Sequence, residues 1–479
     1  MSASKSTSPI LVWFRRDLRT SDNPALNAAA KSGAPVIPLY ILNNKPVPWH
    51  PGGASSWWLE GSLTKLDEDL TLINSRLILR CGDPKKILLE LAKTTCAQAL
   101  YFTRLYEPNA VNEEKSVAAC FSKVGLDCRR FGGTVLFEPE EITSKSGKPF
   151  KVFTPFYKAC LSMGEIKKPF STPTELVSPV QWPESDQLSN WNLRPSAPNW
   201  AIGLQGHWSP GSNAAKTRLK TFFANNIAKY DKDRDRPDRE GTSALSPHLQ
   251  FGEISPREIH NFICCSDNSV RGATLGHTAF LREIFWREFS YHLLWHWPHI
   301  VETPFKNDFK NFPWRQDDQA LTSWKRGMTG YPIVDAGMRQ LWETGWMHNR
   351  VRMIVASFLT KHLLLPWQEG ARWFWDTLVD ADLANNAASW QWVAGTGADA
   401  SPYFRIFNPI LQSLKFDPKG EYVRRWVPEI AKLSNQFIHT PWKSGECIEA
   451  YPDPIVEHRA ARQRALQAYK SLKSNSNTL

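Results

Sequence analysis

The sequence predicts two structural parts, an N-terminal α/β domain built on a doubly wound parallel sheet and a C-terminal all-helical domain. Strand-like and helix-like segments alternate at the start, a stretch rich in proline and serine follows, and helix start signals dominate after residue 212. A chain of 479 residues exceeds what one hydrophobic core usually organises. We therefore expect an α/β domain at 1–137, a linker at 138–211 and a helical domain at 212–479.

The alternation begins with an apolar, β-prone segment, Ile10–Phe14. Asp22-Asn23-Pro24 combines capping residues with a proline, which marks the start of a helix over Ala25–Lys31. No GxGxxG follows the first strand, so a standard dinucleotide site is not supported there. Further strands are expected at Pro35–Leu42, Arg76–Arg80 and Ala99–Thr103, and a further helix at Pro84–Thr95.

Proline and serine interrupt the pattern between the two parts, for example in KKPFSTPTELVSPVQWPESD, which is typical of a linker that runs over the surface. Two signals mark helices beyond it. Ser246-Pro247 places a capping residue before a proline at the first helical position. Ser255-Pro256-Arg257-Glu258 is a capping box with the same proline.

The charge of the chain favours a polyanionic partner. The net charge is +11 and the pI is near 9.2, which suits nucleic acid first and an anionic membrane second. An ordinary basic protein explains these values equally well. No apolar run approaches the roughly 20 residues of a spanning helix, and no secretory signal is evident, so we expect neither membrane insertion nor export.

Cysteine and histidine spacing indicates no metal centre. Eight cysteines without a CxxC are typical of reduced thiols in a cytosolic chain. Only Cys264, Cys265 and Cys447 lie in the C-terminal half, too few for a four-cysteine iron–sulfur site. His292 and His296 have metal-compatible spacing, but no third ligand can be placed, so we expect them to be structural.

Tryptophan is concentrated in the helical part. Of 22 tryptophans, 14 follow residue 285, which is more than a core needs because each buried indole N–H requires a partner. Stacking surfaces for bases or a cofactor would use them, and so would electron transfer.

The densest motif is DADLANNAASWQW, residues 380–392. On a helix Asn386 and Trp390 share a face, whereas Trp392 points to nearly the opposite side. If Asn386 and Trp390 face one ligand, Trp392 therefore faces something else. The alternative is a core helix with two packed indoles.

Two further motifs place unusual side chains on single helix faces. In LREIFWREF, Glu283, Trp286 and Arg287 form a stripe of acid, ring and cation, which a solvated salt-bridge face would not need. In GWMHNRVRM, Asn349, Arg352 and Met353 form another stripe. The acid of the first motif together with the amide and the thioether of the second suits a pocket for a flat heterocycle. Glu283 and Asn349 can then bind its polar edge, with Trp286 and Trp392 stacked on its faces.

A fourth motif, YDKDRDRPDREGTSALS, offers a phosphate site. Gly241-Thr242-Ser243 leads into a helix beginning near Ser246, so backbone N–H groups, hydroxyls and a helix N-terminus converge. Most Gly-Thr-Ser segments are only loops and caps, so this signal is weak alone.

Six motifs together resemble a known family. FRRDLR, EGTSALS, LREIFWREF, TGYPIVDAGMRQLWETGWMHNRVRM, DADLANNAASWQW and PYFRIFNP occur in this order, and the chain resembles the photolyase/cryptochrome family along nearly its whole length. The similarity is to the microbial class I and class III photolyases for cyclobutane pyrimidine dimers. The resemblance implies an N-terminal antenna domain for a light-harvesting chromophore, a long linker and a helical domain that binds FAD.

The resemblance also implies roles for individual residues. An Arg352–Asp380 ion pair lies beside the flavin, Asp382 contacts the flavin–ribityl region, Asn386 faces N5, and Trp390, Trp367 and Trp314 form the chain that reduces the flavin. The FAD residues are Tyr230, Thr242, Ser243, Ala244, Leu245, Ser246, Arg352, Asp380, Ala381, Asp382 and Asn386. The dimer pocket is Glu283, Trp286, Asn349, Arg350, Met353 and Trp392, with Arg234, Arg287 and Gln412 toward DNA.

The mechanism implied by the resemblance is light-driven electron transfer. Fully reduced FADH⁻, excited by blue or near-ultraviolet light, donates one electron to a flipped-out dimer, whose cyclobutane ring opens and returns the electron. Glu283 and Asn349 would stabilise the charge that develops on the thymine carbonyls. Glu283 can donate a hydrogen bond only when it is protonated.

Several relatives with other functions are disfavoured. A cryptochrome photoreceptor often carries a long C-terminal extension, and the plant proteins have aspartate at position 386, whereas this chain has a short tail and Asn386. A (6-4) photolyase is expected to have histidine at Asn349, and a DASH-type protein lacks a tryptophan at Trp392. A non-enzymatic nucleic-acid-binding flavoprotein explains the charge but not Glu283 with Asn349.

The antenna site departs from the family pattern. YEPNAVN has Ala110 where the best-known folate-binding relatives have glutamate, so their folate contacts cannot be transferred. Trp57-Trp58 offers a stacking surface or core packing. We expect a second chromophore, methenyltetrahydrofolate rather than a deazaflavin, and a cytoplasmic monomer, nucleoid-associated in a bacterium, whose partner is UV-damaged DNA without an evident protein partner.

Overall fold

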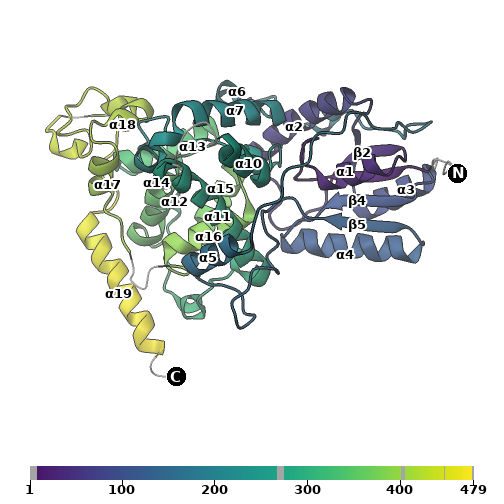
Figure 1. Cartoon of the computed structure of the whole chain (residues 1–479). Helices are drawn as coiled ribbons and strands as arrows, with labels where there is room; N and C mark the ends of the chain where they lie inside the picture. Colours follow the sequence, from purple (N-terminus) through teal and green to yellow (C-terminus); the bar gives the residue numbers. More distant parts are fainter. Residues whose placement is uncertain (1–7, 267–273, 401–404, 447, 477–479) are drawn as a thin grey trace.

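The computed structural model describes residues 8–266, 274–400, 405–446 and 448–476. A parallel sheet with helices on both faces forms one end of the molecule, and a larger helical body forms the other (Figure 1). The predicted fold class, α/β followed by all-α, is confirmed. Residues 402–404 of the PYFRIFNP motif, Cys447 and the last three residues of the tail lie outside the described residues.

The sheet has five parallel strands in the order β3-β2-β1-β4-β5. Ile10 pairs with Val36 on one side and with Ala99 on the other, so the first strand is central. Its five residues are all buried, as expected of an apolar strand covered on both faces. The strands are β1 (Ile10–Phe14), β2 (Val36–Leu42), β3 (Ile78–Cys81), β4 (Ala99–Thr103) and β5 (Asp127–Phe131).

Alternate residues of β1 enter two different cores. Leu11 and Trp13 pack on one face of the sheet, and Val12 and Phe14 on the other. Asn23 caps the first helix, as its position before Pro24 predicts, by accepting from the Leu26 N–H at 3.0 Å. The helices of this part are α1 (Pro24–Lys31), α2 (Gly53–Thr71), α3 (Pro84–Thr94) and α4 (Pro108–Lys123).

The interval 138–211 contains ordered elements beside its extended segments. Helix α5 (Phe153–Ser162) contributes Phe153 and Phe156 to the core of the helical part. Helix α6 (Ile202–His207) and a short 3-10 turn, η1 (Leu188–Trp191), follow. The domain limits proposed from the sequence remain a prediction.

The two helix start signals had different outcomes. The capping box is present, because Ser255 Oγ accepts from the Glu258 N–H at 2.9 Å and Glu258 Oε2 accepts from the Ser255 N–H at 3.0 Å. Ser246 as a cap was wrong by one residue, since it is the first residue of its helix and Leu245 precedes it. The Ser246 hydroxyl accepts from the indole N–H of Trp346 instead, at 3.3 Å.

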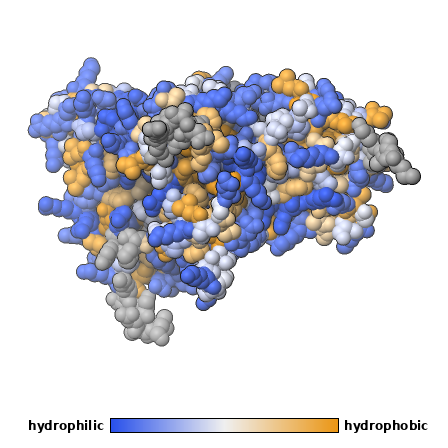
Figure 2. Space-filling view, viewed as in Figure 1, coloured by the Kyte–Doolittle hydropathy of each residue, from blue (hydrophilic) through white to orange (hydrophobic). Residues whose placement is uncertain are grey.

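The helical body packs around one large core that contains Trp324 and Trp367. Among the described residues no helix is long and apolar enough to cross a membrane. Hydrophilic side chains cover most of the face in Figure 2. The helices of the helical body are α7 (Ser212–Asn225), α8 (Tyr230–Asp233), α9 (Ser246–Gln250), α10 (Pro256–Ser266), α11 (Leu275–His296), α12 (Asp318–Arg326), α13 (Pro332–Thr344), α14 (Asn349–Ser357), α15 (Trp367–Thr377), α16 (Leu383–Ala394), α17 (Pro409–Phe416), α18 (Glu421–Trp426) and α19 (His458–Ser476). It also contains a π-helical turn, η6 (Phe358–His362), and 3-10 turns at Ile227–Lys229, Pro298–Val301, Asn307–Asn311, Pro428–Ile430 and Pro441–Lys443.

Buried polar contacts join the sheet domain to the helical body. Asp22 accepts from Ser255 Oγ at 2.5 Å and pairs with Arg257 at 2.9 Å. Arg19 donates to the Gly252 carbonyl at 2.8 Å. Because Asp22 and Arg19 are almost completely buried, these contacts fix the α/β domain against the body rather than tether it loosely.

Candidate active site

A cavity of about 590 Å³ opens inside the helical body. Helices α8, α11, α14 and α16 and the segment 242–246 supply its walls, so motifs far apart in sequence meet there. The predicted residues that line it are Tyr230, Arg234, Thr242, Ser243, Ala244, Leu245, Ser246, Glu283, Trp286, Arg287, Asn349, Arg350, Arg352, Met353, Asp380, Ala381, Asp382, Asn386, Trp390 and Trp392.

The loop before α9 has an unusual backbone. Ala244 adopts φ +48°, which places a non-glycine residue in the left-handed region. Gly241 packs so closely on α8 that a Cβ would lie 2.9 Å from the Asp233 carbonyl oxygen. Strain of this kind is concentrated at functional sites, and here it shapes the wall that the sequence predicts for phosphates.

Arg352 and Asp380 form the expected ion pair. Arg352 Nη2 lies 2.8 Å from Asp380 Oδ2, and its Nε donates to the Met347 carbonyl at 2.7 Å. Asp380 Oδ1 is buried and has no hydrogen-bond partner among the described residues, and the same holds for Gln250 Oε1 in the same cavity. Unpaired buried acceptors are costly unless a ligand satisfies them. A cavity of this size with free acceptors and hydroxyls fits a group as large and as rich in donors as FAD.

Tyr291 is a site residue that sequence reasoning missed. Its hydroxyl donates to Asp382 Oδ2 at 2.5 Å, while Asp382 Oδ1 caps α16 by accepting from the Asn385 N–H at 2.8 Å. Burial, and next the Asp382 charge, raise the pKa of Tyr291 well above its usual value, so the hydroxyl stays protonated and donates. Both oxygens of Asp382 are therefore fixed in direction.

Glu283 is paired with Arg234 at the edge of the cavity. Arg234 Nη1 lies 2.5 Å from Glu283 Oε1, and each side chain is about a quarter exposed, at 27% and 28%. Arg350 pairs in the same way with Asp235, at 2.8 Å. A carboxyl donates a hydrogen bond only through its O–H, so a hydrogen bond from Glu283 to a substrate requires a proton on the oxygen that does not face Arg234.

Trp286 is supported by a residue from the predicted linker. Phe153 lies parallel to it, with ring centroids 3.7 Å apart and planes inclined by 7°. The Phe153 N–H donates to Asp399 at 3.2 Å. The sequence contained no periodic signal for this contact because Phe153 is 133 residues away in a proline-rich interval.

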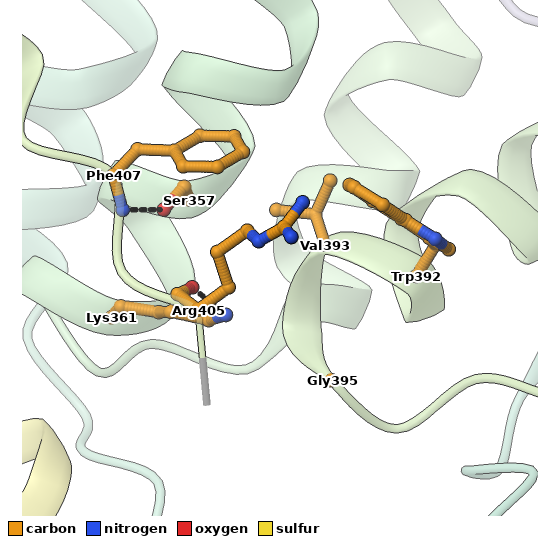
Figure 3. A pocket seen from close by; sticks show the side chains of 7 residues that line it. All are labelled: Ser357, Lys361, Trp392, Val393, Gly395, Arg405 and Phe407. Atoms are coloured by element: carbon orange, nitrogen blue, oxygen red, sulfur yellow. Dashed lines mark hydrogen bonds between the residues drawn. The ribbon is translucent and has the colours of Figure 1, made fainter. Parts of the chain in front are cut away.

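Trp392 faces a second, much smaller pocket of about 10 Å³ (Figure 3). Ser357 Oγ accepts from the Phe407 N–H at 3.3 Å, and Lys361 donates to the Arg405 carbonyl. Arg405 then lies 6.0 Å from the centre of the Trp392 ring, within cation–π distance. Trp392 lines this pocket and also the large cavity that Asn386 and Trp390 line, so the expectation that Trp392 faces something else holds only for the small pocket.

Trp390 is buried against α15. It lies 6.3 Å from Trp324, and a Cβ on Gly370 would come within 2.1 Å of its ring, so glycine permits this approach. Trp367 begins α15 and is buried in the same core, while Trp314 packs against that core from outside. Neither Trp367 nor Trp314 lines the cavity.

Arg287 and Gln412, both predicted to face DNA, lie in different surroundings. Arg287 is only 8% exposed, donates to the Thr134 carbonyl at 2.8 Å, and lies over the Tyr291 ring. This placement argues against a direct DNA contact and for support of the cavity wall. Gln412 lies on α17, outside the cavity lining.

The histidine pair on α11 contacts backbone groups of the segment before α5. His292 Nε2 accepts from the Phe150 N–H at 3.0 Å, and His296 contacts the Pro139 carbonyl at 3.1 Å. Burial, aided by His296, lowers the pKa of His292 to about 4. No cluster of three metal-ligating side chains occurs among the described residues.

The architecture is not that of a Rossmann dehydrogenase, because the nucleotide-sized cavity lies in the helical body and not at the parallel sheet. Two family descriptions match the chain: "DNA photolyase" at residues 10–175 and "FAD binding domain of DNA photolyase" at residues 280–471. The chain belongs to the photolyase/cryptochrome family.

Individual relatives cover the chain almost completely. A deoxyribodipyrimidine photo-lyase of Agrobacterium fabrum is 48% identical over 99% of this chain and 100% of its own length. Cryptochrome-1 of Arabidopsis thaliana is 38% identical, covering 96% of this chain and 70% of its own. The crystal structure of a class III photolyase from Agrobacterium tumefaciens superposes with a TM-score of 0.95 at 47% identity, covering 99% of both chains.

Proposed function

We propose that the protein repairs cyclobutane pyrimidine dimers in DNA, using FAD and light. The observation that carries the proposal is that Glu283, Asn349, Trp286 and Trp392 line the same cavity as the Arg352–Asp380 pair. Polar groups for a heterocycle edge and rings for its faces are thus next to the residues assigned to the cofactor. A cavity for FAD alone would not need them.

FAD would be held by Thr242–Ser246, Arg352, Asp380, Asp382 and Asn386. When bound and fully reduced, it supplies one electron under blue or near-ultraviolet light. Tyr291 and the helix cap hold the Asp382 carboxylate in place, and the Asn386 amide is oriented by donating to the Ala371 carbonyl at 3.0 Å. Oriented groups of this kind need no rearrangement when charge moves.

The dimer would enter flipped out of the duplex, between Trp286 and Trp392. Asn349 and protonated Glu283 would donate to its carbonyl oxygens, where negative charge develops. Because Arg234 pairs with Glu283 in the lesion-free protein, a DNA phosphate that binds Arg234 would free Glu283 for this role.

The proposal is tested with a thymine-dimer oligonucleotide, by dimer loss in light and in darkness. Glu283→Ala should lower the single-turnover repair yield more than the lesion affinity, since its benefit is greatest when the dimer carries an extra electron. Trp286→Ala should chiefly weaken lesion binding, by about 1–3 kcal/mol for one stacking partner. Normal repair by both variants would show that the dimer does not bind in this pocket.

A signalling photoreceptor is the second candidate, because a plant cryptochrome matches 96% of the chain. If the wild type with fully reduced flavin repairs no dimer under light, this candidate replaces repair. A colourless, folded preparation that takes up no FAD would exclude both.

Photoreduction of the flavin through Trp390, Trp367 and Trp314 belongs to the same proposal. Trp390→Phe should slow photoreduction while sparing repair by chemically reduced protein.

We further propose a second chromophore in the α/β domain, a folate before a deazaflavin, which an absorption spectrum would identify. Monomeric behaviour and a location in the cytoplasm with chromosomal DNA complete the proposal. Trp57 and Trp58 are only 3% and 0% exposed and form part of a core, so they offer no open stacking surface for that chromophore.

A further inference from the structure

Two ion pairs of opposite polarity tie the segment after α8 to two helices of the cavity wall. Arg234 and Asp235 are neighbours in sequence. Arg234 pairs with Glu283 on α11 at 2.5 Å, and Asp235 pairs with Arg350 on α14 at 2.8 Å. The Arg350 and Asp235 side chains are 20% and 37% exposed, so a phosphate of bound DNA can reach this pair.

All three guanidinium nitrogens of Arg350 are occupied. Nε and Nη2 both donate to Asp235 Oδ1, at 3.3 Å and 2.8 Å, and Nη1 donates to Met353 Sδ at 3.8 Å. The guanidinium also lies 4.4 Å from the centre of the Phe416 ring. Carboxylates and phosphates bind the same fork of arginine donors. Asp235 therefore occupies the edge of Arg350 that would otherwise bind a DNA phosphate.

The other arginines of this segment also face carboxylates. Residues 231–240, DKDRDRPDRE, contain five acids and four bases, in a chain whose net charge is +11. Arg236 pairs with Asp238 at 2.5 Å, and Arg239 pairs with Asp233 at 2.8 Å. The segment therefore adds little net attraction for a phosphate, although the chain as a whole is basic.

The Arg350–Asp235 pair responds differently to undamaged and damaged DNA. A phosphate of an undamaged duplex only replaces one anion on the guanidinium by another, after the existing pair has been broken. A flipped-out dimer that binds in the cavity holds the flanking phosphates beside the cavity wall. Displacement of Asp235 then becomes an intramolecular step, in which the phosphate competes at a high effective concentration.

We propose that Asp235 is a specificity-determining residue, which withholds Arg350 from undamaged DNA and releases it only to a phosphate beside a dimer bound in the cavity. The inference rests on the proposed function, since it requires that the cavity takes the dimer. Asp235 acts through Arg350, as a positioning residue.

The test measures how DNA affinity depends on salt for the full-length, FAD-containing protein, in darkness so that no dimer is split. Two duplexes of one sequence, with and without a thymine dimer, are titrated from about 50 to 200 mM salt. Asp235→Asn should steepen the slope of log affinity against log salt by about 0.9 for the undamaged duplex, the value of one phosphate contact, and leave the dimer duplex unchanged. Arg350→Gln should instead reduce the slope for the dimer duplex by about 0.9 and leave the undamaged duplex unchanged. The double variant should lose the gain on undamaged DNA.

Glu90→Gln is the matched control, because it removes the same charge from an arginine pair on α3 of the α/β domain, with Arg80 at 2.8 Å. Both slopes should stay as in the wild type, and Asp235→Glu, which keeps the carboxylate, should also preserve them. Should Asp235→Asn unfold or lose FAD, Arg350→Gln decides, since equal effects on both duplexes contradict the proposal.

Three results would overturn the role of Asp235 alone. One is an unchanged slope for undamaged DNA in Asp235→Asn, and another is equal steepening in Asp235→Asn and Glu90→Gln, which would reduce the effect to net charge. The third is weaker dimer binding by Asp235→Asn, which would mean that the pair presents Arg350 to DNA. A wild type that binds both duplexes equally at every salt concentration overturns the proposed function as well.

Discussion

At the scale of single residues, the site depends on neighbours that carry no motif. Tyr291 fixes Asp382, Arg234 holds Glu283, and Phe153 supports Trp286. Each of these partners lies on a different element from the motif residue it contacts, so tertiary packing decides its effect. Matched substitutions can separate the effect of these partners on the site from their effect on the free energy of unfolding.

Phe153 and Phe156 provide such a pair. Both lie on α5 and are 1–2% exposed, but only Phe153 stacks on Trp286. Phe153→Leu and Phe156→Leu should each cost about 1–2 kcal/mol of unfolding free energy, from lost ring packing. Only Phe153→Leu should also weaken lesion binding, because Trp286 loses the ring that holds it parallel. Urea unfolding and lesion affinity measure the two effects, and equal lesion affinity in both variants would refute the supporting role.

The lowered pKa of Lys361 predicts that the free energy of unfolding depends on pH. Burial, and next the Arg405 charge, lower its pKa from 10.5 to about 7. Between these pH values the unfolded chain binds the proton that the folded protein has released, so stability from this group rises as the pH increases from 7 toward 10.5. Lys361→Met removes this contribution. The slope of unfolding free energy against pH over this range should become smaller by at most about 1.4 kcal/mol per unit; Lys65→Met, on exposed α2 surface, should not change it.

At the scale of elements, local sequence signals predicted where strands and helices start better than which elements contact one another. The central strands and α1 were predicted within two residues, because continuous apolar runs and Asn23-Pro24 are local features. β5, with the sequence DCRRF, was missed because an edge strand that is half exposed carries no apolar pattern. The glutamate, the amide and the tryptophans, which helical spacing places on shared faces, line one cavity. The inward orientation of Arg287 was not predicted, because it depends on a hydrogen bond to Thr134 in a distant segment.

Helix α10 shows how one cap serves two purposes. Ser255 Oγ accepts from the Glu258 N–H and donates to buried Asp22 at 2.5 Å. Ser255→Ala should cost about 2–3 kcal/mol, the sum of a cap and a hydrogen bond to a charged group. Asp317→Ala removes the cap of α12, which accepts from Ala320 at 2.9 Å without joining domains, and should cost about 1 kcal/mol. Equal losses in urea unfolding would mean that the Asp22 contact adds nothing.

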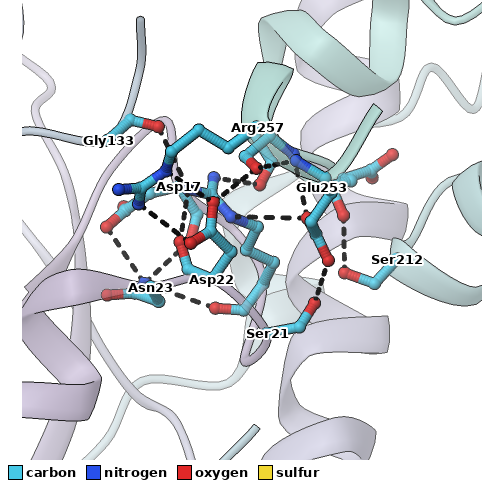
Figure 4. Close-up of polar contacts among 12 residues, drawn as sticks. Asp17, Ser21, Asp22, Asn23, Gly133, Ser212, Glu253 and Arg257 are labelled. Carbon is cyan, nitrogen blue, oxygen red and sulfur yellow. Dashed lines mark hydrogen bonds and ion pairs between the residues drawn. The ribbon is translucent and has the colours of Figure 1, made fainter. Parts of the chain in front are cut away.

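At the scale of the whole molecule, the α/β domain and the helical body act as one unit. Buried contacts from Asp22, Arg19 and Trp58 cross the junction. In the last of these contacts, the Trp58 indole N–H donates to the buried Glu253 carboxyl at 3.1 Å, and Figure 4 shows Glu253 and Asp22 among the polar groups at the junction. The proposed second chromophore would need a fixed distance and orientation to the cavity, and rigid buried contacts achieve this better than a flexible linker.

The net charge of +11 predicts how DNA binding responds to salt. Lysine and arginine that contact phosphates release counterions, so the logarithm of affinity should fall linearly with the logarithm of salt concentration. With about six phosphate contacts, affinity should fall roughly a thousandfold between 50 and 200 mM salt. The ratio of lesion to undamaged affinity should change much less, because in the proposed function the pocket, and not the charge, recognises the dimer. Titrations of both duplexes across this range measure the two slopes. Trp286→Ala should reduce the ratio and leave both slopes unchanged, and a flat salt dependence would mean that the basic surface does not contact the phosphates.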